Sequence, residues 1–329
     1  MRVRSKIELG PRKIVNSVIF VIFLAVVYFS RYGWHFVKAS FTVYAKEDRA
    51  LAQVLKNHVS VLSHQIGWRG LDQYENLQKA ADYIANSFAQ TGLKVQRQEF
   101  LAQGKTVGNV AAEKKGSTYP QKVIIVGAHY DTYFNPGADS NASGVAALLE
   151  LAEIFSKIET HATIRFVAFA NKEPPFFATD EMGSLVYAKH LKEANEDIEA
   201  VIILDSIGYY SNISYSQHYP PFLGFFYPDK GNFLCLVGNM RSRALLQSLE
   251  TVLKKDTSLV IAKVMGFDFI NSDHWAFWRE NFNTVLMTDT GSYRNPYINS
   301  LSDTYPKLNY LNMAQLVRGL AFALKALAD

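Results

Sequence analysis

Cysteine is nearly absent from this sequence of 329 residues, which contains a single one, Cys235. A disulfide within the chain is therefore excluded, and cysteine usage leaves the redox compartment open. Cys235 lies in an apolar run, where a lone cysteine is most often a small core residue rather than a catalytic thiol. We therefore look to other side chains for the chemistry of this protein.

Charge of either sign is also scarce. The formal net charge is +4, and charged residues make up 19% of the chain, against 49% hydrophobic residues. After residue 13, no stretch of Arg and Lys is interleaved with aromatic residues, so we expect no nucleic-acid partner. Internal repeats and low-complexity tracts are missing as well. A chain of this length and composition is too hydrophobic to be generally disordered and can bury a large core.

Long apolar runs are absent except for one near the N-terminus, at residues 14–30, which Arg31 closes. The run is short for a membrane span of about 20 residues. Basic residues precede it, and the aromatic residues that follow suit the headgroup region of a bilayer. We predict a cytoplasmic basic tail at residues 1–13 and a transmembrane signal anchor at residues 14–30.

The positive residues before the anchor predict that the rest of the chain lies on the far side of the membrane. We therefore expect a single-pass membrane protein with an extracytoplasmic domain at residues 45–329. A cleaved signal peptide is the alternative, because Val37-Lys38-Ala39 resembles a cleavage site, but this site lies well past the apolar run.

The stretch from Val123 to Glu173 organises the remaining chain. Apolar runs at Val123–Val126 and Phe166–Ala170 predict buried strands, and the pattern from Val145 to Ile154 predicts a helix between them. Strand, helix and strand in this order indicate a parallel unit with a right-handed crossover. Ligands bind beyond the carboxyl ends of such strands.

Potential metal ligands follow both of these strands. His129 and Asp131 lie just past the first strand and Glu173 just past the second, while Asp139 lies in the loop that opens the helix. Imidazole and carboxylate groups are typical zinc ligands. The position of His129 after a buried strand, followed by Asp131 and with Asp139 nearby, favours a metal ligand over a structural histidine.

The rest of the chain alternates strands and helices. Strands are predicted at residues 93–100, 107–112, 163–169, 200–204, 233–237, 259–264 and 284–287, and helices at 141–158, 182–192, 241–253 and 311–327, after a largely helical region between residues 41 and 104. Residues 209–232 lack periodicity and predict a long loop. The aromatic residues of this loop favour packing in an ordered wall over a substrate-binding box.

Six short motifs occur in order along the chain. They are Gly127–Thr132, Gly137–Gly144, Asn171–Phe177, Asp205–Tyr210, Ser272–His274 and Arg294–Pro296. Together they resemble the co-catalytic zinc exopeptidases of the bacterial leucyl aminopeptidase type (peptidase family twenty-eight), whose superfamily includes glutaminyl cyclases and the transferrin receptor. The resemblance covers residues 45–329. It implies a phosphorylase/hydrolase-like α/β fold, a three-layer sandwich with a mostly parallel mixed sheet and helices on both faces.

The resemblance also implies roles for individual residues. His129 and Glu173 would bind one zinc ion, Asp205 would bind the other, and Asp139 would bridge both. Asp131 would orient His129, because a ligating imidazole usually donates from its other nitrogen to a carboxylate.

Two positions depart from the family pattern. Lys172 stands where the family has the glutamate that acts as general base, and Asn299 stands where it has a histidine that binds the same zinc as Asp205. An amide is a poor zinc ligand, and an ammonium cannot accept a proton at neutral pH. We therefore expect one zinc ion, where the family has two, and impaired catalysis.

Three further residues are candidates for the neighbourhood of the site. We expect Asp273 and His274 to line the pocket or to support the metal ligands. His218, in the long loop, is a weaker candidate for the missing ligand.

By resemblance, the protein would be a membrane-anchored zinc metallopeptidase, an aminopeptidase that removes N-terminal residues from peptides through a metal-activated water. The first alternative is a non-catalytic pseudopeptidase that binds a peptide or protein partner, a change that the transferrin receptor shows to be possible. The second is an acyltransferase of the glutaminyl-cyclase kind. The likeness to bacterial enzymes leads us to expect a bacterial inner membrane for the anchor.

Overall fold

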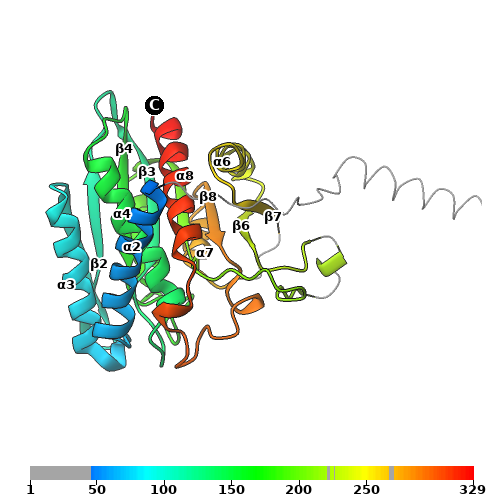
Figure 1. Cartoon of the computed structure of the whole chain (residues 1–329). Coiled ribbons are helices and arrows are strands. Elements are labelled where there is room, and N and C mark those ends of the chain that lie inside the picture. The colour runs from blue at the N-terminus through cyan, green and yellow to red at the C-terminus, as the bar shows by residue number, and fades with distance from the viewer. Residues whose placement is uncertain (1–45, 221–222, 226, 267–269) are drawn as a thin grey trace, which may run out of the picture. The chain divides into compact units, whose positions relative to one another are not determined.

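The computed structural model describes residues 46–220, 223–225, 227–266 and 270–329 (Figure 1). The predicted basic tail (1–13) and transmembrane anchor (14–30) lie outside the described residues. Among the helices of the described part, none combines the length and the apolar character needed to cross a bilayer. The N-terminal assignments therefore stay predictions.

The centre of the fold is an eight-stranded mixed sheet with the strand order β1-β2-β4-β3-β5-β8-β6-β7. The strands are β1 (Lys94–Ala102), β2 (Lys105–Lys114), β3 (Tyr119–His129), β4 (Ala162–Phe169), β5 (Asp197–Leu204), β6 (Phe233–Gly238), β7 (Val260–Met265) and β8 (Thr284–Thr288). The pairs β3–β4, β3–β5, β5–β8 and β6–β7 are parallel, and the other neighbours are antiparallel. The predicted mostly parallel mixed sheet is confirmed.

Helices cover both faces of this sheet. One face packs against α3 (Tyr74–Gln90), α4 (Gly144–Ser156), α6 (Arg243–Asp256) and α8 (Tyr310–Ala328), with α2 (Lys46–Ser60) packed on α4 and α8, and the other face packs against α5 (Gly183–Glu193) and α7 (His274–Arg279). Figure 1 shows α2, α4 and α8 side by side in front of the strands. The predicted three-layer sandwich is therefore confirmed.

Strand β3 shows why the central strands form continuous apolar runs. Ile124 and Val126 pack on the face of α4, while Val123 and Ile125 pack on the opposite face. The first four residues of β3 are exposed, and from Val123 onward both faces are covered, so the sequence there is apolar up to Ala128. The same burial places the polar residues that follow β3 at the rim of the sheet.

Two local predictions need correction. Helix α4 begins at Gly144 rather than at Asn141, because residues 138–143 form an irregular wide turn. Asn141 Oδ1 accepts a hydrogen bond from the Gly144 N–H at 3.0 Å, so a side chain of this turn satisfies the first N–H group of the helix. Helix α7 was not predicted, because its six residues are too few to show helical periodicity.

The long segment 209–232 contains no strand and no α-helix among its described residues, as predicted. The rings of Tyr219 and Tyr227 stack with their centroids 5.8 Å apart, whereas Tyr215 and Phe225 are each 81% exposed. The expected packing is therefore present for some of the aromatic residues and not for these two.

A buried arginine fixes the loop that follows β3. The Arg69 side chain is fully buried, and within the described ranges its guanidinium group donates hydrogen bonds to main-chain carbonyls. The acceptors are the carbonyls of Leu62, Gly67, Tyr130, Pro136 and Gly137. Thr132 adds a further tie, since its Oγ1 accepts from the Arg69 N–H at 2.9 Å. The loop between His129 and Asp139 is thus held by one side chain from outside the sheet.

We expect Arg69→Met to lower the free energy of unfolding by about 3 kcal/mol, because several buried carbonyls lose their donor. Urea unfolding of both proteins measures the loss. Arg97→Met is the matched control, since Arg97 pairs with Asp82 at the surface and its removal should cost less than about 1 kcal/mol. Equal losses in the two variants would contradict the role assigned to Arg69.

Candidate metal centre

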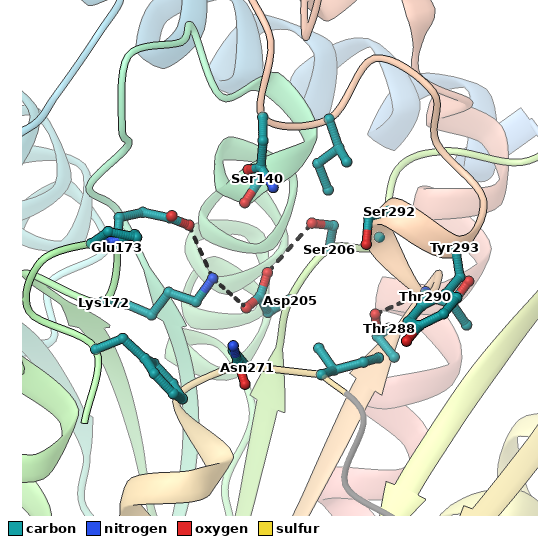
Figure 2. Close-up of a pocket in the computed structure, with 16 residues that line it drawn as sticks. Ser140, Lys172, Glu173, Asp205, Ser206, Asn271, Thr288, Thr290, Ser292 and Tyr293 are labelled. Atoms are coloured by element: carbon teal, nitrogen blue, oxygen red, sulfur yellow. Dashed lines mark hydrogen bonds and ion pairs between the residues drawn. The ribbon is translucent and has the colours of Figure 1, made fainter. Parts of the chain in front are cut away.

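Four of the predicted residues meet at the carboxyl ends of three neighbouring strands. His129 is the last residue of β3, Lys172 and Glu173 follow β4, and Asp205 follows β5. Because β4, β3 and β5 are adjacent and parallel, their ends lie at the same rim. Figure 2 shows the side chains of Lys172, Glu173 and Asp205 turned toward one another.

The polar atoms of these four side chains lie within ion-pair distance. His129 Nε2 is 3.5 Å from Asp205 Oδ1 and 4.0 Å from Glu173 Oε1. Lys172 Nζ lies between the two carboxylates, 3.0 Å from Glu173 Oε1 and 3.5 Å from Asp205 Oδ2 (Figure 2). All four residues are buried, so the charges act on one another with little solvent screening.

Asp131 accepts hydrogen bonds that hold the backbone of this group in place. Its two carboxylate oxygens accept hydrogen bonds from the main-chain N–H groups of Lys172, at 3.0 Å, and Glu173, at 2.8 Å. The other ring nitrogen of His129, Nδ1, is 3.1 Å from the Asp131 carbonyl oxygen and 3.4 Å from its Oδ1. In the tautomer with a proton on Nδ1, His129 donates to Asp131 and keeps the lone pair of Nε2 for a metal. The implied orienting role of Asp131 fits this geometry.

The donor set suits zinc in its chemistry. Zinc bonds to nitrogen and oxygen of about 2.0–2.2 Å in a tetrahedral arrangement put neighbouring ligands about 3.3 Å apart, near the 3.5 Å and 4.0 Å found here. His129 Nε2 is buried and has no hydrogen-bond partner within the described part of the chain. The described residues nevertheless hold no His, Cys, Asp and Glu group already in metal-binding geometry. The ammonium group of Lys172 gives a physical reason for this, because it pairs with the Glu173 and Asp205 carboxylates that would bind the metal.

Asp139, the predicted bridging ligand, lies in a separate cluster. Its Oδ1 accepts from the Gly208 N–H at 2.9 Å and its Oδ2 from Asn295 Nδ2 at 2.7 Å. Burial raises the pKa of Asp139 well above its ordinary value, and the neighbouring carboxyls of Asp289 and Asp303 raise it further. Among the described residues, no hydrogen bond or ion pair joins Asp139 to the His129 group.

Asn299 lies on the wall of the cavity that opens onto the site. This cavity has a volume of about 390 Å³ and is also lined by Lys172, Glu173 and Asp205. Its remaining wall is mixed, with apolar residues beside hydroxyl and amide groups: Phe177, Ile270, Ile298, Ser206, Asn271, Thr288 and Tyr293. Asn299 thus lines the same cavity as three of the candidate site residues.

The remaining candidates are placed less centrally. Asp273 and His274 are fully buried at the start of α7 and do not line the cavity. Burial raises the pKa of Asp273 to about 6, against the opposing charge of the nearby His129. His218 lines a different, small cavity beside Cys235, and burial raises the pKa of Cys235 to about 12, as expected for a core thiol.

Electrostatics keep Lys172 charged. Burial alone would lower the pKa of Lys172, but the carboxylates of Asp205 and Glu173 outweigh this and hold it above its ordinary value. Burial likewise acts to raise the pKa of Asp205, and the charges of Lys172 and His129 keep it below its ordinary value. At neutral pH Lys172 is therefore a cation and has no lone pair with which to accept a proton.

Sequence comparison now places the chain in a family. The sequence pattern of peptidase family M28 matches residues 109–323. The chain belongs to peptidase family M28. Its sequence is also 35% identical over 287 residues to the uncharacterized protein YfbL of Escherichia coli, with 82% of this chain and 87% of YfbL covered.

Solved structures share the fold of this M28 chain. The zinc aminopeptidase BSAP from Bacillus subtilis superposes with a TM-score of 0.68 at 17% identity, over 84% of this chain and 95% of BSAP. Glutaminyl cyclase from Tannerella forsythia gives a TM-score of 0.63 at 18% identity, over 83% and 98%. Both the fold and the family implied by the sequence motifs are confirmed.

The protonation of His129 predicts how zinc binding depends on pH. Burial and the charge of Lys172 act to lower the pKa of His129, but Asp205 and the contact with Asp131 raise it to about 10. Zinc binds neutral imidazole, so it must displace this proton.

We therefore expect the apparent zinc affinity to fall about tenfold for each unit that the pH drops from about 8 to about 6. Titration calorimetry in buffers of different ionisation enthalpy should detect about one proton released per zinc ion. An affinity that stays flat between about pH 8 and pH 7 would indicate an ordinary histidine pKa and contradict this prediction.

Proposed function

We propose that this protein is a zinc-binding member of the M28 family that binds the N-terminal part of peptides and hydrolyses them poorly or not at all. The observation that carries the proposal is the buried ammonium of Lys172, paired with Glu173 and Asp205, at the position that the family resemblance gives to the general base.

Three donors would hold the zinc ion: His129 Nε2, a Glu173 oxygen and an Asp205 oxygen. The structural relative BSAP is a zinc aminopeptidase, and the donor types here suit the same metal. A zinc ion would supply Lewis-acid polarisation of the scissile carbonyl and activation of the attacking water.

The residues of this chain limit the proton transfers that hydrolysis needs. A general base must take a proton from the attacking water, and such catalysis typically contributes about 10²–10⁴-fold to the rate. Lys172 is a cation held by two carboxylates, and the Glu173 oxygen nearest to it, at 3.0 Å, is already engaged. Binding of the substrate can therefore persist where turnover is lost.

The cavity suits a peptide N-terminus. Its lining includes the polar side chains of Ser206, Asn271 and Thr288, which can accept hydrogen bonds from a terminal ammonium group, beside the apolar Phe177, Ile270 and Ile298. An apolar side chain of the terminal residue fits such a wall. A non-catalytic protein that binds a peptide or protein partner would use the same surface.

Hydrolysis of leucine p-nitroanilide tests the impairment. We expect the native protein to be slower by about 10²-fold or more than Lys172→Glu with Asn299→His, in which a base and a zinc ligand are restored. Lys189→Glu, a charge reversal at the exposed Lys189–Asp180 pair, is the matched control and should behave like the native protein. Turnover by the native protein that a chelator abolishes, at a rate equal to that of the double variant, would sink the proposal.

We also propose that residues 14–30 anchor the protein in a membrane, with the M28 domain outside the cytoplasm. The full chain should stay with the membrane fraction through alkaline carbonate extraction and keep an intact N-terminus by mass spectrometry. Leu24→Arg should release it, since arginine near the centre of a span costs about 2.5–3.5 kcal/mol, while Ser30→Arg at the edge should not. Cleavage before residue 45 would show a signal peptide instead.

A further inference from the structure

The proposed function does not explain why the ammonium group of Lys172 lies between two candidate metal ligands. Lys172 Nζ contacts Glu173, its neighbour after β4, and Asp205, which follows β5. The two carboxylates come from separate loops and converge on one ammonium group (Figure 2). A zinc ion bound by carboxylates from different loops makes this kind of contact.

Two further residues were expected near a second metal ion, Asp139 and Asn299. Both oxygens of Asp139 already accept hydrogen bonds, from the Gly208 N–H and from Asn295 Nδ2. Asn299 offers an amide to the cavity, and amides are poor zinc ligands. Asp139 is therefore held by partners outside the His129 group, and position 299 offers no good zinc ligand.

The balance of charge at the site also favours one divalent ion beside the Lys172 ammonium group. Buried carboxylates need a cation close by, and Glu173 and Asp205 are both buried. One divalent ion together with the Lys172 ammonium gives three positive charges, against the three negative charges of Glu173, Asp205 and Asp131, whose carboxylate contacts His129. These groups with a single divalent ion are therefore close to neutral.

We propose that Lys172 takes the place of the second metal ion, so that the centre binds a single divalent cation beside a fixed ammonium group. The inference deepens the proposed function and rests on its zinc ligands. Lys172 is a positioning residue here: it holds Glu173 and Asp205 near His129 Nε2, and its charge opposes the entry of a second cation.

Counting zinc ions tests this directly. The native protein, saturated with zinc and freed of excess by gel filtration, should carry one zinc per chain by elemental mass spectrometry. Lys172→Glu with Asn299→His should carry two. Two tightly bound zinc ions in the native protein would overturn the inference while leaving zinc binding by this M28 protein intact.

Affinity gives a second readout that does not depend on activity. Lys172→Met removes the ammonium but keeps the length of the side chain, so the first zinc ion loses a repelling neighbour. We expect this variant to bind zinc roughly tenfold or more tightly in chelator competition, with Lys189→Met as the surface control at native affinity. An unchanged affinity in a variant that unfolds like the native protein would show that Lys172 does not face the metal. If Lys172→Met fails to fold, the zinc count of the native protein decides.

The outcomes separate the two proposals. A native protein that binds no zinc overturns both. A native protein that binds one zinc ion and hydrolyses peptides rapidly contradicts the impaired function and supports the single-ion centre.

Discussion

A buried ammonium group held between two carboxylates is the interaction on which the rest of the site depends. Lys172 Nζ lies 3.0 Å from Glu173 and 3.5 Å from Asp205, and all three side chains are largely withdrawn from solvent. Removing one partner of such a group leaves an uncompensated buried charge, which typically costs about 3–5 kcal/mol. Replacing Lys172, Glu173 or Asp205 alone is therefore destabilising. The ion pairs also keep the loops after β4 and β5 together.

The sheet supplies the frame for this interaction. Adjacent parallel strands β4, β3 and β5 end at one rim and deliver Glu173, His129 and Asp205 there. Asp131 then joins the loop after β3 to the loop after β4, and Arg69 fixes the far end of the first loop from the helical layer. The geometry of the site is thus a property of the whole three-layer fold rather than of any one motif.

Much of this was predictable from the sequence, and the limits have physical causes. Strands buried on both faces leave apolar runs that sequence reveals, and the convergence of His129, Glu173 and Asp205 follows once those strands are parallel neighbours. The surroundings of Asp139 could not be predicted, because its partners Gly208 and Asn295 are distant in the chain. Helix α7 was missed because it is shorter than two turns.

Asp131 holds the peptide N–H groups of Lys172 and Glu173, and not their side chains. The backbone at position 172 is therefore fixed whatever side chain it carries. Lysine and glutamate codons differ by a single base, and the backbone at this position would fit either residue. A glutamate here would stand beside the buried carboxylates of Glu173 and Asp205, so this exchange is coupled to the number of cations that the rim holds rather than to the course of the loop.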